Sequence, residues 1–439
     1  MNGKNPLFEL FVFLQDPHLV ASFQRLCGVR GTAREAGRLH PQQPAGAELA
    51  PALDGRGGIR TQTLTDDENP EESSSSSSVS ERSKLTANGG RLTGATSAET
   101  PGQSTLRPRR KNSLTGEAGQ EFLIENRFWY YLFTFGTELG NELFYISFFP
   151  FIAWNVDPFV GRRIIMLWSW VMYLGQCTKD LVSWPRPMSP PVVKVEMFYN
   201  SEYSMPSTHA MSATAIPVAL FYMTSERWEY PSTLGFIVAP CWCLLVCVSR
   251  IYMGMHSVLD VIAGVLFSAV ILLFLLPLLD VIDSFIMTWH SAPLVIVSVH
   301  VGLGLFCFTL DTWSTSRSDT AQILGTGSGV ALASHINYRL GLLPDPDGLP
   351  LTLPALGAGL VLTCLFRLLL GVLVLMGTRE LMKALTIPLL CRLVGLPGHD
   401  VRKARQHMEV ELPHRYLVYC AVGFNVLFLV PIIFNLLSL

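Results

Sequence analysis

From Phe128 onward the chain is dominated by apolar stretches long enough to cross a lipid bilayer. A spanning helix needs about 20 mostly apolar residues, and inside the bilayer every backbone N–H and C=O must find an internal partner. We therefore predict an all-α polytopic membrane protein with 8–10 transmembrane helices. The stronger segments are 129–153, 160–178, 208–224, 233–252, 257–280, 285–310, 353–377 and 415–437, and the weaker ones are 319–337 and 381–397.

The composition supports a membrane protein and argues against a nucleic-acid partner. Of 439 residues, 49% are hydrophobic and only 15% are charged. The formal net charge of -2 offers no basic surplus for nucleic acid. Most of the nine cysteines lie in apolar windows, and no pair has a zinc or disulfide spacing.

The first quarter of the chain has a different composition. Residues 28–118 are rich in Gly, Ser, Thr, Glu and Arg, with almost no aromatic residues, so we predict a disordered N-terminal arm. Residues 1–27 precede it as a candidate interfacial helix, and residues 119–439 form one multispan membrane domain. The basic run Arg109–Lys111 before Ser113 indicates a phosphorylation site.

Polar residues interrupt the apolar pattern at three places, and the first is the end of the second span. Lys179 is followed by Arg186 and Pro187 in a K-x6-R-P pattern. The prolines end the helix and place Arg186 in a loop at the membrane surface. Taken alone, a Lys and an Arg here also suit ordinary interface anchors.

The second place is Pro206-Ser207-Thr208-His209, where the third span begins. Ser207 suits an N-cap, which would leave His209 without a special role. The free N–H groups of a helix N-terminus also form an anion site, here beside a hydroxyl and an imidazole. This segment alone fits both interpretations.

The third place joins Ser249 and Arg250 to His256 and Asp260 in an S-R-x5-H-x3-D pattern. If the chain is helical after Gly254, His256 and Asp260 are an i, i+4 pair on one face. Asp260 can then accept a hydrogen bond from one ring nitrogen and leave the other as a nucleophile. The alternative is an arginine at the membrane edge beside a helix-capping aspartate.

Topology predicts that the three places converge. The loop 188–206 contains no span, so the first two places lie on one side, and the spans 208–224 and 233–252 return the chain to that side. Three cations would repel one another without an anion, and a phosphate dianion is their natural ligand. The predicted phosphate-binding residues are Lys179, Arg186, Ser207, Thr208, Ser249 and Arg250.

The order of these three patterns resembles that of the type 2 phosphatidic acid phosphatase superfamily, which includes vanadium haloperoxidases, and within it the sphingosine-1-phosphate phosphatases. The resemblance implies a haloperoxidase-like helical core in which His256 is the nucleophile, His209 the general acid and base, and Asp260 the residue that orients His256. The family commonly has Gly where this chain has Thr208. A hydroxyl here replaces the close backbone approach that Gly allows.

The implied activity is removal of phosphate from sphingosine 1-phosphate and related sphingoid base phosphates through a phosphohistidine, with the bilayer as the other partner. The sequence contains no carboxylate cluster for magnesium, so we expect neither metal nor cofactor. The resemblance also implies the endoplasmic reticulum membrane with a lumenal active site. It does not specify an oligomeric state or a role for residues 310–439.

Four alternatives stay open at this point. They are a broader phosphatase acting on phosphatidate or lysophosphatidate, a vanadate-dependent oxidase, a catalytically dead relative, and a non-enzymatic transporter in which Arg367 marks a pathway.

The charges that flank the spans favour two different orientations of the chain in the membrane. Arg162 and Arg163 favour an orientation in which the three motifs lie on the side away from the cytosol, whereas the basic cluster at 107–111 favours an N-terminal arm in the cytosol.

Overall fold

The computed structural model describes residues 5–31, 122–196, 202–310, 316–343, 350–355, 357–396 and 401–439. Most of the predicted disordered arm, from residue 32 to residue 118, and the predicted phosphorylation site lie outside this described part. The first residues of the predicted arm are described, and Val29–Gly31 forms a short strand, so disorder was wrong for them.

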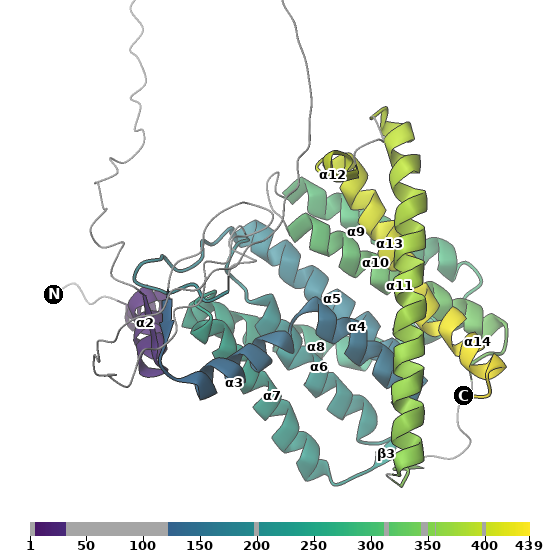
Figure 1. The fold of residues 1–439 in the computed structure, drawn as a ribbon, viewed down its shortest axis with the longest axis horizontal. Coiled ribbons are helices and arrows are strands. Elements are labelled where there is room, and N and C mark those ends of the chain that lie inside the picture. Colours follow the sequence, from purple (N-terminus) through teal and green to yellow (C-terminus); the bar gives the residue numbers. More distant parts are fainter. Residues whose placement is uncertain are drawn as a thin grey trace, which may run out of the picture. The chain divides into compact units, whose positions relative to one another are not determined.

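Helices make up most of the described chain, which confirms the all-α prediction (Figure 1). Two short strand pairs accompany them: β1 (Val29–Gly31) with β2 (Phe122–Ile124), antiparallel, and β3 (Trp228–Glu229) with β4 (Leu351–Thr352), parallel. The helices are α1 (Pro6–Gln15), α2 (Pro17–Leu26), α3 (Arg127–Glu138), α4 (Glu142–Phe151), α5 (Pro158–Val182), α6 (Thr208–Thr224), α7 (Ser232–Tyr252), α8 (Val258–Thr288), α9 (Ala292–Leu310), α10 (Ser316–Arg339), α11 (Ala358–Val394), α12 (Val401–Ala404), α13 (Met408–Leu427) and α14 (Leu429–Leu436).

Within the described residues, five helical segments are long and apolar enough to cross a membrane, so the chain is a multi-pass membrane protein. They are α7, α8, α9, α11 and the continuous segment formed by α13 and α14. The other predicted spans α5, α6 and α10 are also helices, but α6 is shorter and α5 and α10 are more polar. The most buried of them is α5, which packs against α6, α8, α9 and α10.

Two predicted spans differ from the structure. The segment 129–153 is divided into α3 and α4 by a turn at Leu139–Asn141. The segment 381–397 is no separate span, because α11 continues through Pro388 from the preceding apolar stretch. Figure 1 shows this long helix running beside α13.

Arg367 lies within α11 and makes a local contact. Its guanidinium donates a hydrogen bond of 3.2 Å to the carbonyl oxygen of Trp154. This partner explains an arginine in an apolar helix without a transport pathway.

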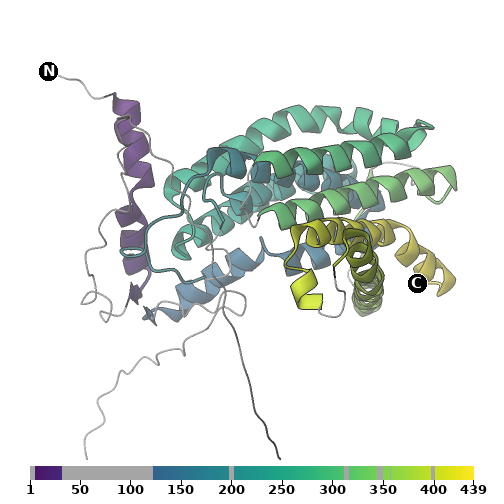
Figure 2. The same ribbon diagram turned by 90° about the horizontal axis from the view of Figure 1, so that it is seen from above.

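The N-terminal helices pack against the membrane domain near its polar motifs (Figure 2). Gln24 of α2 is buried, and its Nε2 donates to the carbonyl oxygens of Val193 at 2.6 Å and Tyr252 at 2.8 Å. Its Oε1 accepts from the N–H of Val193 at 2.9 Å. The Gln24 amide therefore joins the loop after Arg186 to the end of α7. An interfacial role for α1 stays a prediction.

Small residues allow α10 and α13 to pack closely. A Cβ on Gly325 would lie 2.5 Å from the carbonyl oxygen of Tyr416, and one on Gly329 would lie 2.1 Å from that of Cys420. This is the G-x-x-x-G arrangement by which membrane helices bring their backbones together.

We therefore predict that Gly329→Ala destabilises the protein by about 1–3 kcal/mol, because the added methyl group meets backbone atoms that cannot move independently. Thermal unfolding of the full chain in detergent measures the effect. Gly377→Ala on α11 is the matched control, since no atom lies within 4 Å of its added Cβ. Equal melting temperatures for both variants would contradict this account of the α10–α13 contact.

Candidate active site

The structure brings the three polar motifs to one cavity of about 220 Å³. The end of α5, the following loop, the start of α6, the end of α7 and the turn before α8 all contribute to it. Six of the nine predicted site residues line it: Lys179, Arg186, Thr208, His209, Arg250 and His256. The other three, Ser207, Ser249 and Asp260, are buried beside its wall.

Ser207 and Ser249 have structural partners. Ser207 is the N-cap of α6, and its N–H donates to the carbonyl oxygen of Asp260 at 3.1 Å, which joins α6 to α8. The hydroxyl of Ser249 donates to Val246 and accepts from Thr137 at 3.1 Å, which joins α7 to α3. In this conformation both serines hold the wall of the cavity together, and their contact with phosphate oxygens stays a prediction.

Two glutamates from the loop between the first two motifs compensate the buried cations. Glu202 lies 3.2 Å from Lys179 and 3.7 Å from Arg186, and Glu196 lies 2.7 Å from Arg250. Burial lowers the pKa of Arg186 to about 10, which leaves this guanidinium charged at neutral pH. The three cations are therefore held together before any ligand arrives.

Arg250 retains an unused donor. Its Nη1 pairs with Glu196, whereas its Nε is buried and has no hydrogen-bond partner among the described residues. A buried N–H without a partner costs about 1–3 kcal/mol. Because Arg250 lines the cavity, a bound anion can remove this cost.

His256 lies in the turn before α8, so the predicted i, i+4 pairing within one helix is wrong. Gly254 has φ +73°, and a Cβ there would lie 2.3 Å from the carbonyl oxygen of Val193. Because Gly254 adopts this left-handed conformation, the backbone forms a turn after α7, and α8 begins only at Val258. Asp260 is then the third residue of α8 and caps it, accepting from the N–H of Ser257 at 2.7 Å.

A serine connects His256 to Asp260. Their nearest side-chain atoms, Nδ1 and Oδ2, are 3.9 Å apart, too far for a hydrogen bond. The hydroxyl of Ser204 lies between them, 3.3 Å from Nδ1 of His256 and donating to Oδ2 of Asp260 at 2.6 Å. Asp260 therefore orients the imidazole through Ser204, which the motifs did not reveal.

The other ring nitrogen of His256 is on the side of the cations. Its Nε2 lies 3.5 Å from Nη1 of Arg186. Burial, reinforced by the positive charges of Arg186, Arg250 and Lys179, holds the pKa of His256 well below its ordinary value. The ring is therefore neutral at neutral pH and keeps a lone pair.

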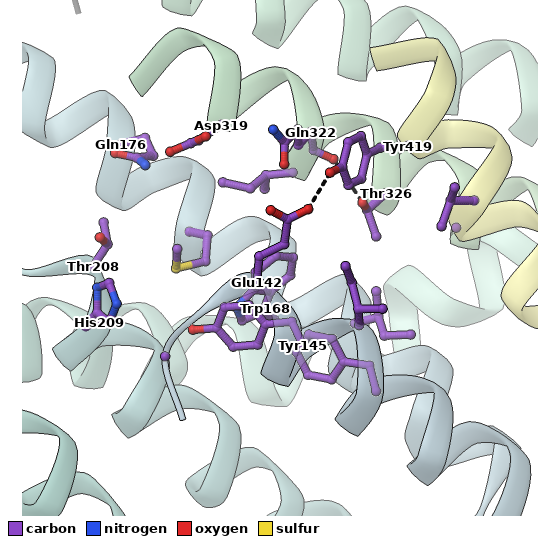
Figure 3. A pocket seen from close by; sticks show the side chains of 18 of the residues that line it. Glu142, Tyr145, Trp168, Gln176, Thr208, His209, Asp319, Gln322, Thr326 and Tyr419 are labelled. Atoms are coloured by element: carbon purple, nitrogen blue, oxygen red, sulfur yellow. Dashed lines mark hydrogen bonds between the residues drawn. The ribbon is translucent and has the colours of Figure 1, made fainter. Parts of the chain in front are cut away.

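His209 enters the same cavity from the first turn of α6, as Figure 3 shows. Its Nε2 lies 3.3 Å from Oδ1 of Asn141, at the turn that separates α3 from α4. A Cβ on Gly140 would lie 2.3 Å from Cδ2 of this ring. The break in the first predicted span therefore makes room for His209 and gives it a partner.

Four functional candidates were absent from the sequence prediction: Asn141, Glu196, Ser204 and Glu202. One signal was available for the glutamates, which are the only acidic residues in the loop Met188–Pro206 that follows the cationic first motif. Nothing in the sequence pointed to Asn141 or Ser204.

The rest of the cavity is largely apolar and extends toward the C-terminal helices. Tyr145, Phe149, Trp168, Leu375 and Val422 line it, so residues beyond 310 contribute to the wall. A ligand that fits has an anionic end and an apolar body. Among the described residues, no group of three His, Cys, Asp or Glu side chains is placed to hold a metal ion.

Comparison with known proteins decides the family. Residues 163–284, which include all three motifs, match the PAP2 superfamily. The chain is 51% identical to sphingosine-1-phosphate phosphatase 1 of Rattus norvegicus over 98% of both chains, and 52% identical to that of Mus musculus over 97% of both. The chain belongs to the sphingosine-1-phosphate phosphatase family.

The match to sphingosine-1-phosphate phosphatases extends well beyond the three motifs. Identity to sphingosine-1-phosphate phosphatase 2 of Homo sapiens is 35%, over 98% of this chain and 99% of that one. These alignments cover the helices after residue 310 that line the apolar part of the cavity. No solved structure matches this sphingosine-1-phosphate phosphatase chain.

The cluster of cations predicts tight binding of orthovanadate, an analogue of phosphate. We expect vanadate to raise the melting temperature of the full chain in detergent, since a ligand that binds only the folded state stabilises it. Arg250→Gln should remove most of this rise, because it removes a buried charge and the unpartnered Nε.

Arg339→Gln is the matched control, since this exposed residue ends α10, does not line the cavity and makes a hydrogen bond to the exposed His290. An unchanged vanadate response in Arg250→Gln would exclude this arginine from the anion site.

Proposed function

We propose that the chain is a phosphohydrolase that dephosphorylates sphingosine 1-phosphate and related sphingoid base phosphates. The observation that carries the proposal is a neutral, buried histidine beside three cations in a cavity whose other lining is largely apolar. The names and high identity of the curated relatives support the same activity.

In the proposed first step, Nε2 of His256 attacks phosphorus, forming a P–N bond as the P–O bond to the lipid breaks. The ring develops positive charge, and its Nδ1–H donates toward the hydroxyl of Ser204. That hydroxyl in turn donates a hydrogen bond to Asp260. His209 in its protonated form donates a proton to the departing alkoxide, so the lipid leaves as a neutral alcohol and His209 becomes neutral.

In the second step, His209 accepts a proton from water as the water oxygen attacks phosphorus. The P–N bond breaks, inorganic phosphate leaves, and His256 returns to its neutral form. Lys179, Arg186 and Arg250 attract the negative charge that grows on the phosphoryl oxygens in both steps. Preorganised charge of this kind is usually the largest catalytic contribution.

The proposal extends to the endoplasmic reticulum membrane, with the cavity facing the lumen, as the family resemblance implies. Arg162 and Arg163, which favoured this orientation, pair with Asp283, and Arg163 also pairs with Asp280. These arginines lie near the start of α5, whereas Lys179 of the cavity lies near its end. This separation along the helix is compatible with a cavity on the lumenal side.

The proposal predicts that His256→Ala abolishes phosphate release, because no other group takes the place of the attacking nitrogen. The measurement is inorganic phosphate released from sphingosine 1-phosphate in detergent with a chelator, which also tests the expected metal independence. His290→Ala, an exposed histidine, is the control. Substantial turnover by a folded His256→Ala protein would reject the assignment, and transport without hydrolysis would favour a carrier.

A separate prediction concerns Ser204. Ser204→Ala should lower kcat by about tenfold or more, because the imidazole loses the hydroxyl that joins it to Asp260. Vanadate binding should be retained, since the cations are untouched. Unchanged kcat would show that Asp260 acts on His256 without this serine.

A further inference from the structure

Beyond the cations, the cavity contains a second polar region that the proposed chemistry does not use. Gln176 on α5, Asp319 on α10 and Glu142 on α4 line it. Figure 3 shows their side chains directed into the cavity from these three helices. All three offer hydrogen-bond acceptors, whereas the phosphate end offers donors.

Gln176 gives the clearest sign of a ligand. The residue is only 3% exposed, and its Oε1 is buried without a hydrogen-bond partner among the described residues. A buried acceptor without a donor costs free energy, so it indicates a donor that a ligand supplies. Gln176 precedes Lys179 by three residues, which places their side chains about 5–6 Å apart at Cβ on one face of α5.

Asp319 adds a negative charge with weak internal compensation. Its contact with Arg415 is 3.7 Å, beyond hydrogen-bonding range, because Arg415 donates to Glu411 at 2.6 Å instead. The Asp319 side chain is 38% exposed although it lines the cavity, so its free surface faces the space that a ligand would occupy. Burial raises the pKa of Asp319 to about 7, so an ammonium group bound beside it would favour its charged form.

The other carboxylate is more fully engaged. Glu142 accepts a hydrogen bond from the hydroxyl of Tyr419. Asp319 and Gln176 are therefore the acceptors available to a cation with several N–H donors.

We propose that Asp319 and Gln176 form a subsite for the primary ammonium group of the substrate. The inference rests on the proposed function, since in a sphingoid base phosphate the amine-bearing carbon is bonded directly to the carbon that carries the phosphate ester. The ammonium group then meets Gln176 and Asp319 while the phosphate meets Lys179 on the next turn of α5. A lipid phosphate without an amine leaves the buried acceptors unpaired, so this subsite selects for sphingoid bases.

The test compares Asp319→Asn with the wild-type full chain in detergent. The KM for sphingosine 1-phosphate should rise about tenfold, equivalent to about 1.4 kcal/mol.

The inhibition constant of vanadate, which has no ammonium group, should stay within about twofold of the wild-type value or fall, since the substitution removes a negative charge near the cations. Asp319→Glu should restore most of the affinity for substrate. The matched control is Asp280→Asn, which removes an exposed carboxylate outside the cavity.

Gln176→Leu provides a second variant, with the same expected rise in KM and the same retained vanadate inhibition. The proposal is overturned if KM for sphingosine 1-phosphate is unchanged in both variants, or if KM and the vanadate constant rise together, which indicates general damage to the site. A wild-type chain that binds vanadate but releases no phosphate would instead refute the proposed function, and the subsite with it.

Discussion

The site depends on keeping three buried positive charges together without a ligand. Lys179, Arg186 and Arg250 reach the cavity from different segments, and like charges in a poorly solvated space repel strongly. Glu202 and Glu196 offset this repulsion from the loop between the first two motifs. This loop therefore supplies both counter-charges and Ser204, and it begins two residues after Arg186.

This electrostatic arrangement also explains why a histidine suits the position of the proposed nucleophile. An imidazole beside several cations loses its proton easily, so the lone pair needed for attack is present at neutral pH. A lysine there would add a fourth positive charge, and a serine would need a separate base. The hydroxyl of Ser204 and the carboxylate of Asp260 then stabilise the ring when it becomes positive.

Much of this site was predictable because its residue types and spacing survive in the linear sequence. Two spans between the second and third motifs return the chain to one side, so convergence followed from counting helices. The contacts of Ser204 and Asn141 were hidden, since both depend on how irregular segments fold around a neighbouring imidazole. The role of His256 was suggested by its spacing from Asp260, yet Gly254 turns the backbone and leaves that histidine outside the helix.

The pairing of β1 with β2 has a consequence for how the chain can change over evolution. Val29 is opposite Ile124, so the two ends of the segment 32–121 are fixed beside each other on the membrane domain. Before this segment, Gln24 donates a hydrogen bond to the last residue of α7, next to the turn that carries His256, and residues after the segment lead into α3. Insertions or deletions between these strands leave both anchor points in place, so this segment can diverge in length while the geometry around His256 is inherited intact.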